Sequence, residues 1–217
     1  MPVLLGRSTD PWTDLKRADE LASRAITVDA NHPGGHLAKG LVLGLERRFD
    51  DAIAEIERTL ALDPSFAEAY GGLGVTYSDI GQYEKAIESF DKAIRLSPQN
   101  QDSAFWYSGK GGAYFGLQQY DQTTEWARRA IAINPNFGSP LFILAAALAL
   151  TGHEAEARDA EERHAACLKS RMSRCSRRSH HLPPLIRAFV QPLTGISRAC
   201  ARPGCRKNER VAIFHLT

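Results

Sequence analysis

Long hydrophobic runs are absent from this sequence of 217 residues. A helix that crosses a bilayer needs about 20 consecutive, mostly apolar residues, and no stretch approaches that length. The first residues, MPVLLGRSTD, hold too short an apolar run before Arg7 to form a secretory signal. The sequence therefore predicts a cytoplasmic protein without a membrane span.

Residues with a catalytic or metal-binding pattern are scarce. All four cysteines follow residue 164, and none forms the C-x-x-C pair that commonly holds zinc. No histidine belongs to an H-E-x-x-H arrangement, and the acidic residues follow helical surfaces, where a run of charge is usually solvated. We therefore expect a protein that is not an enzyme and that uses neither a metal nor another cofactor.

A glycine-rich stretch, GKGGAYFG at residues 109–116, suggests nucleotide binding at first. A phosphate-binding loop needs the spacing G-x-x-x-x-G-K-[ST] or G-x-G-x-x-G between a strand and a helix, so that backbone N–H groups converge on the anion. Neither spacing occurs, because Lys110 lies between the glycines and Tyr114 stands where the last glycine would be. We reject the phosphate-loop interpretation.

The charge is nearly balanced but unevenly distributed, with a net value of +2. Residues 1–164 hold 16 Lys and Arg against 24 Asp and Glu, a balance of −8, and residues 165–217 hold 11 against one, a balance of +10. With 43% hydrophobic and 24% charged residues, the chain has the composition of a folded, soluble protein. An acidic body is thus followed by a basic tail.

The body contains an internal repeat. Residues 67–100, AEAYGGLGVTYSDIGQYEKAIESFDKAIRLSPQN, form a unit of 34 residues. Gly74 is matched by Gly40 at a distance of 34 residues and by Gly111 at a distance of 37, where the extra residues are QDS at 101–103. Each unit reads as two helices, because apolar and small residues recur every three and four positions on both sides of a central break, and a proline follows the second helix. The repeat therefore predicts an all-α chain of helix pairs.

This pattern resembles the tetratricopeptide repeat, whose signature is matched by Tyr70, Leu73, Gly74, Tyr77, Ala86, Phe90, Ala93 and Pro98. The resemblance implies an all-α, right-handed superhelix, or solenoid, of stacked helix pairs. The composition after residue 164 indicates that an irregular basic C-terminal tail follows it. The predicted parts are an N-terminal extension at 1–10, a half repeat at 11–32, repeats at 33–66, 67–100 and 104–137, a terminal unit at 138–164, and a disordered tail at 165–217. The repeat array thus covers residues 11–164.

The resemblance also implies a binding surface, because the first helix of each unit lines the concave wall of such a superhelix, and this wall binds partners. The residues at the matching positions include Leu41, Leu45, Glu68, Val75, Ser78, Asp79, Phe105, Ser108, Phe115 and Phe142. None of the Lys, Arg and Asn residues with which related proteins grip the acidic C-terminus of a chaperone stands there. We expect a non-catalytic module that binds a protein or peptide through apolar anchors. The alternative is that part of the wall closes on the chain's own ends.

Several positions depart from the repeat. Glycine inside a helix costs about 0.5–1 kcal/mol relative to alanine, so the surplus glycines at 71, 72, 109 and 112 indicate either tight helix packing or a groove opened for a ligand. Lys39 and Lys110 replace the usual leucine, which weakens the packing unless Lys110 keeps its stem on the helix pair and its ammonium in water. Thr123 replaces a tightly packed alanine, which predicts that the repeat at 104–137 is the looser one.

The tail at 165–217 is rich in Arg, Ser, Cys, His and Pro, and three interpretations compete. A basic arm binds nucleic acid or an anionic membrane surface by counterion release, whereas a plain extension is simply disordered. The third interpretation is an out-of-frame translation of GC-rich DNA. We favour the third interpretation, because the incomplete unit at the N-terminus also indicates a piece of a longer gene product. Nucleic acid is therefore not the expected partner. Binding of nucleic acid or an anionic surface through the tail remains the alternative function.

The central segment at residues 93–136 also resembles repeat arrays found behind nucleotide-cyclase or response-regulator domains in large bacterial signalling proteins. Nothing of a cyclase domain is present in the sequence. The resemblance implies a scaffold or regulatory piece of a larger protein, by analogy of fold.

Overall fold

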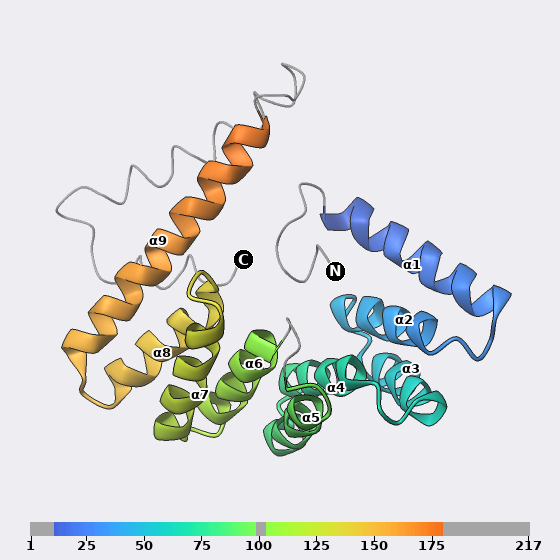
Figure 1. Cartoon of the computed structure of the whole chain (residues 1–217), viewed down its shortest axis with the longest axis horizontal. Coiled ribbons are helices and arrows are strands. Elements are labelled where there is room, and N and C mark those ends of the chain that lie inside the picture. Colours follow the sequence, from blue (N-terminus) through green and yellow to red (C-terminus); the bar gives the residue numbers. More distant parts are fainter. Residues whose placement is uncertain (1–10, 99–102, 180–217) are drawn as a thin grey trace. The chain divides into compact units, whose positions relative to one another are not determined.

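The computed structural model describes residues 11–98 and 103–179. In this part every regular element is an α-helix, and the helices are α1 (Pro11–Val28), α2 (Pro33–Leu45), α3 (Phe49–Leu62), α4 (Ala67–Asp79), α5 (Tyr83–Leu96), α6 (Ser103–Gly116), α7 (Tyr120–Ile133), α8 (Gly138–Leu150) and α9 (Glu154–Ser179) (Figure 1). The predicted all-α fold class is confirmed. The predicted extension at 1–10 lies outside the described residues.

The helices form hairpins that stack in chain order. α2 packs on α3, α4 on α5 and α6 on α7, and successive hairpins meet through α3 with α4, α5 with α6 and α7 with α8. The helices α2, α4, α6 and α8 also touch one another directly, each with the next. We call these four the first-helix layer, and α3, α5, α7 and α9 the second helices. The exact repeat boundaries stay a prediction.

The turn inside each hairpin contains one residue with a left-handed backbone. Arg47, Gly81, Gln118 and Gly152 hold these positions, with φ of 63°, 76°, 60° and 82°. Glycine adopts this conformation without a steric penalty, whereas a residue with a Cβ pays about 1–2 kcal/mol. The period of the sequence is therefore repeated in the backbone, even where the glycine is missing.

Glycines of the first-helix layer make room for aromatic rings. Phe90 of α5 is fully buried, and a Cβ added to Gly74 or Gly109 would lie 2.7 Å or 2.4 Å from its ring. A Cβ on Gly71 would lie 2.3 Å from the indole nitrogen of Trp106. Tight packing thus accounts for Gly71 and Gly109, and the alternative that these two open a groove for a ligand is wrong.

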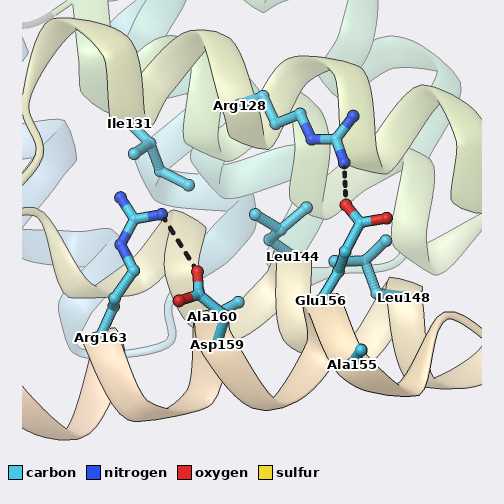
Figure 2. A pocket seen from close by; sticks show the side chains of 9 residues that line it. All are labelled: Arg128, Ile131, Leu144, Leu148, Ala155, Glu156, Asp159, Ala160 and Arg163. Atoms are coloured by element: carbon cyan, nitrogen blue, oxygen red, sulfur yellow. Dashed lines mark hydrogen bonds and ion pairs between the residues drawn. The ribbon is translucent and has the colours of Figure 1, made fainter.

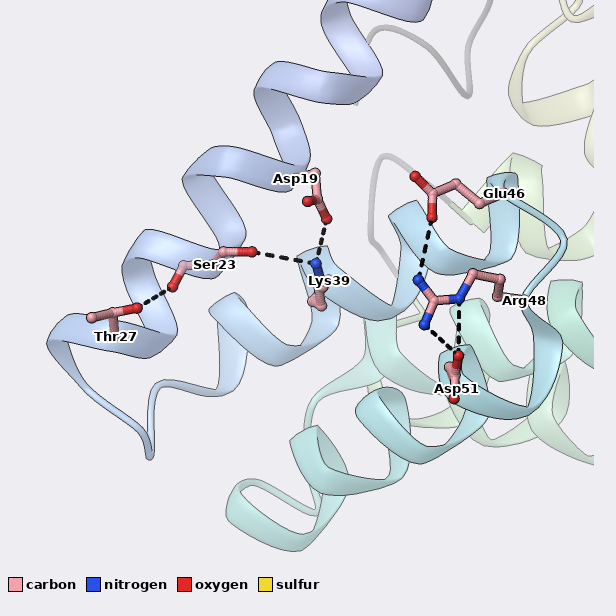
Figure 3. A network of polar contacts seen from close by, with 7 residues as sticks. All are labelled: Asp19, Ser23, Thr27, Lys39, Glu46, Arg48 and Asp51. Carbon is pink, nitrogen blue, oxygen red and sulfur yellow. Dashed lines mark hydrogen bonds and ion pairs between the residues drawn. The ribbon is translucent and has the colours of Figure 1, made fainter.

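The two lysines that replace leucine both reach back to the preceding helix. Lys39 of α2 donates to the carboxylate of Asp19 on α1 at 2.6 Å (Figure 3). Lys110 of α6 pairs with Asp91 of α5, and its ammonium lies 3.7 Å from the centre of the Trp126 ring. Since Lys110 is only 4% exposed, the prediction that its ammonium stays in water is wrong. An anion and an aromatic face replace the water.

A buried histidine ties the turn after α1 to the first hairpin. His36 is 2% exposed. Its Nε2 lies 2.9 Å from the carbonyl oxygen of Ala30, and its Nδ1 lies 2.7 Å from the carboxylate of Glu55 on α3. A carbonyl oxygen only accepts hydrogen bonds, so Nε2 donates to Ala30. Through both of its ring nitrogens, the buried histidine therefore connects the turn after α1 with α3.

Helix α9 continues past the predicted start of the irregular tail. Residues 165–179 are helical and end at Ser179, which corrects the expectation of an irregular chain from residue 165. The segment AACLKSRMSRCSRRS contains no proline or glycine and is rich in good helix formers, so nothing in it stops the helix. The chain divides into the units Met1–Lys169 and Ser170–Thr217. The rest of the predicted tail, at 180–217, lies outside the described residues.

Candidate functional site

The predicted wall residues all lie on the first-helix layer. They are Leu41 and Leu45 of α2, Glu68, Val75, Ser78 and Asp79 of α4, Phe105, Ser108 and Phe115 of α6, and Phe142 of α8. Because each first helix touches the next, these side chains are distributed along one continuous layer. Their role in binding stays a prediction.

Exposure separates these residues into three groups. Leu45 and Phe142 are 39% and 46% exposed, and Glu68 and Asp79 are exposed as well. Ser108 is buried, and the remaining residues are half-buried. The exposed group is what a partner would meet first.

The half-buried apolar residues are continuous with the core. Val75 and Phe105 pack against the cluster that contains Phe90, and Leu41 packs against the cluster that contains Ile56. The core fixes the buried side of each of these residues. They form an ordered apolar surface between the exposed residues.

The two serines of the predicted wall use their hydroxyl protons within the protein. Ser78 donates to the carbonyl oxygen of Gly74 at 2.9 Å, one helical turn earlier. Ser108 of α6 lies 3.4 Å from the hydroxyl of Ser139 on α8, to which it donates. The half-buried Ser78 hydroxyl can therefore offer a partner an acceptor oxygen but no free proton, whereas the buried Ser108 links α6 to α8.

Phe142 is exposed but held in place at one edge. Its ring lies 5.7 Å from the imidazole of His164 on α9, at a tilt of 48°. The imidazole in turn donates from Nδ1 to the carbonyl oxygen of Gly138 at 2.9 Å, which fixes its orientation. Phe142 is therefore a preordered aromatic group on the surface.

Leu150 is a residue of the same kind that the predicted wall does not include. It is 59% exposed and is the last residue of α8. Leu45, Asp79 and Gly116 are the last residues of α2, α4 and α6. The spacings along this row are 34, 37 and 34 residues, which are the repeat distances, so the period alone could have identified Leu150.

A separate hollow of about 400 Å³ lies among α7, α8 and α9 (Figure 2). Ile131, Leu144 and Leu148 give it an apolar floor. The charged residues of its rim pair with one another. Arg128 lies 2.6 Å from Glu156, and Arg163 lies 3.7 Å from Asp159, both of α9. None of the predicted wall residues lines this hollow, so it is distinct from the first-helix surface.

Two further findings concern the described part of the chain. Residues 11–98 and 103–179 contain no group of His, Cys, Asp and Glu that could hold a metal ion. None of the described helices has the length and apolar character required to cross a membrane.

Residues 67–100 match the family described as Tetratricopeptide repeat. The chain carries a tetratricopeptide repeat. A curated relative, the Small glutamine-rich tetratricopeptide repeat-containing protein 2 of Mycosarcoma maydis, is 27% identical over 88 residues, which is 41% of this chain and 25% of that protein. The chain therefore matches about a quarter of this relative's length. Tetratricopeptide repeats form a protein-interaction scaffold and are generally not catalytic.

Solved structures show the same repeat architecture. The crystal structure of MamA is 23% identical, has a TM-score of 0.62, and the match covers 77% of this chain and 96% of that one. YrrB, described as a tetratricopeptide repeat protein with an unusual peptide-binding site, is 25% identical with a TM-score of 0.56, over 67% of this chain and 74% of that one. The array of helix pairs is thus a tetratricopeptide-repeat solenoid.

Proposed function

We propose that the first-helix layer binds a segment of a partner protein, either extended or helical, through apolar anchors. The supporting observation is that Leu45, Phe142 and Leu150 remain exposed on the layer, beside half-buried residues that the core holds in place. Ordered aromatic and aliphatic groups of this kind lose little conformational freedom on binding. An amphipathic helix or an extended peptide with spaced apolar residues would cover them.

The experiment selects short random peptides on the full chain and measures their affinity by fluorescence anisotropy. The variants Leu45→Ser and Phe142→Ser remove exposed anchors from the first-helix layer. The matched controls are Leu96→Ser and Ile133→Ser, because these residues are 45% and 47% exposed but lie on the second helices α5 and α7. The two pairs therefore differ in their place on the repeat, with little difference in exposure.

We expect each layer variant to weaken binding by about fivefold or more, since loss of a significant anchor costs at least about 1 kcal/mol. The control variants should bind as the wild type does. A loss confined to the controls would place the binding surface on the second helices and contradict the proposal. Failure of the selection to yield any binding peptide would also contradict it.

We further propose a setting for this module, as a cytoplasmic scaffold or regulatory piece of a larger signalling protein. The support is the resemblance of residues 93–136 to arrays in bacterial signalling proteins. The alternative function, binding of nucleic acid or an anionic surface, depends on the Arg-rich tail, most of which lies outside the described residues. Such binding would weaken steeply with salt, whereas binding to apolar anchors would not.

A further inference from the structure

Charged side chains are few on the first-helix layer. The Asp, Glu, Lys and Arg residues of α2, α4, α6 and α8 are Lys39, Glu68, Asp79 and Lys110. α8 has none. Glu68 lies in the first turn of α4, where the helix dipole favours an acid. The other charge that this layer offers a partner depends on the surroundings of Lys39, Asp79 and Lys110.

Both cations of the layer are directed to the preceding helix. Lys39 binds Asp19 and also lies 3.3 Å from the hydroxyl of Ser23, both on α1. The side chain of Lys110 is 5% exposed and is paired with Asp91 of α5. Since each ammonium already has an anion, neither lysine gives the exposed surface a free positive charge.

Asp79 stands at a position where its charge is unfavourable for its own helix. It is the last residue of α4, at the end where the helix dipole is negative. α2, α4, α6 and α8 have no basic residue in their last turns. A carboxylate at such a helix end is repelled by the dipole, and a cation brought by a partner would relieve that repulsion.

The surroundings of the Asp79 carboxyl also favour a cation supplied by a partner. Burial raises the pKa of Asp79, and the guanidinium of Arg47 lowers it by less. Arg47 also lies over the ring of Phe49, at 6.0 Å from its centre. The ionised carboxyl is thus incompletely solvated and incompletely neutralised, although the residue as a whole is exposed.

We infer that the first-helix layer selects a partner segment that carries lysine or arginine beside its apolar anchors, and that Asp79 is the residue that reads this charge. The geometry is the row of helix ends, in which Leu45 precedes Asp79, and Gly116 and Leu150 follow. Along this row an apolar group is followed by an acid, then by a glycine, and then by a second apolar group. This inference rests on the proposed function, because it concerns the partner of the same surface.

The test uses the full chain and three synthetic peptides with the same spaced leucine and phenylalanine residues. They differ at one position, which is lysine, glutamine or glutamate. The protein variants are Asp79→Asn and Arg47→Ala. Glu88→Gln is the matched control, because it removes an exposed carboxylate from the second helix α5.

We expect the lysine peptide to bind roughly 2- to 5-fold more tightly than the glutamine peptide, as for an exposed ion pair, and the glutamate peptide to bind least tightly. Asp79→Asn should abolish this preference, Arg47→Ala should increase it, and Glu88→Gln should leave it unchanged. The melting temperature of Asp79→Asn should not fall, because the variant removes an unfavourable charge from a helix end.

The outcomes separate this inference from the proposed function. Equal binding of the three peptides, with Phe142→Ser still weakening all of them, would overturn the charge selection and leave the apolar surface standing. Preference for lysine that survives Asp79→Asn would overturn the role of Asp79. Absence of any peptide binding, or binding unaffected by Phe142→Ser, would contradict the proposed function itself.

Discussion

Replacement of Gly109 by alanine should destabilise the array, although alanine is the better helix former. The added Cβ would lie 2.4 Å from Cζ of Phe90, a ring that is fully buried between α4 and α6. The ring cannot move away from α6, because Gly74 of α4 lies on its other side. A Cβ built on Gly74 would be 2.7 Å from the ring. The matched control is Gly112→Ala in the same helix, where the nearest atom, on Ile143, is 3.7 Å from the new Cβ.

The two substitutions should have opposite signs. Alanine gains about 0.8–1 kcal/mol over glycine in a helix interior, and overpacking of a filled core costs about 1–3 kcal/mol. Gly109→Ala should therefore lower the free energy of unfolding by about 1–2 kcal/mol, because the contact with Phe90 is severe. Gly112→Ala meets only an ordinary contact and should raise it by about 0.5–1 kcal/mol.

Urea denaturation of the full chain, followed by circular dichroism, measures both changes. A second substitution, Phe90→Leu, makes space beside residue 109, so it should cost less in the Gly109→Ala background than in the wild type. If Gly109→Ala stabilises the protein as much as Gly112→Ala does, the ring is not clamped between the two glycines. The packing explanation for the surplus glycines would then fail.

Three further predictions concern charged groups. Asp91→Ala should lower the free energy of unfolding by about 1–3 kcal/mol in urea denaturation, because it leaves the buried ammonium of Lys110 unpaired. The loss is limited because the carboxylate of Asp91 is partly exposed. The double variant Asp91→Ala, Lys110→Leu should recover most of the lost stability, and no recovery would refute the pairing. Glu55→Ala should lower the free energy of unfolding by about 1–3 kcal/mol in the same assay, because it removes the hydrogen-bond partner of Nδ1 on the buried His36. An unchanged free energy of unfolding would refute the role of this contact. Only the ionised carboxylate of Asp79 attracts lysine, and burial raises the pKa of this group. On acidification, the preference for the lysine peptide should therefore disappear at a higher pH than it would with an ordinary aspartate. A preference that stays constant down to pH 4 would contradict this.

The sequence carried enough information to predict the helix pairs, because the repeat contains its own boundaries. Glycine at position 81 allows the left-handed turn between two helices, and the proline at 98 follows the end of α5. Small residues at regular distances predicted close helix contact, and Gly74 and Gly109 show it against Phe90. These features are local or strictly periodic, which is why a single sequence discloses them.

Features that depend on contacts between units could not be predicted in the same way. The partner of Lys110 is Asp91, which lies on the preceding hairpin. The residues of the repeat that contains Lys110 do not indicate this partner. The repeat pattern could not predict the continuation of α9 to Ser179, because this pattern is lost after residue 164. Loss of a packing pattern does not end a helix when the residues remain good helix formers. Which wall residues are exposed, such as Phe142, also depends on packing across units.

The most direct test of the binding surface is site-specific photocrosslinking with a peptide selected on the full chain. Benzoylphenylalanine is placed at position 142 on α8 or at position 133 on α7, where the native residues Phe142 and Ile133 are 46% and 47% exposed. Equal exposure makes the two probes equally accessible, so a difference in yield reports where the peptide lies. We predict crosslinks from position 142 that an excess of unlabelled peptide suppresses, and none from position 133. Crosslinks from position 133 alone would contradict binding on the first-helix layer.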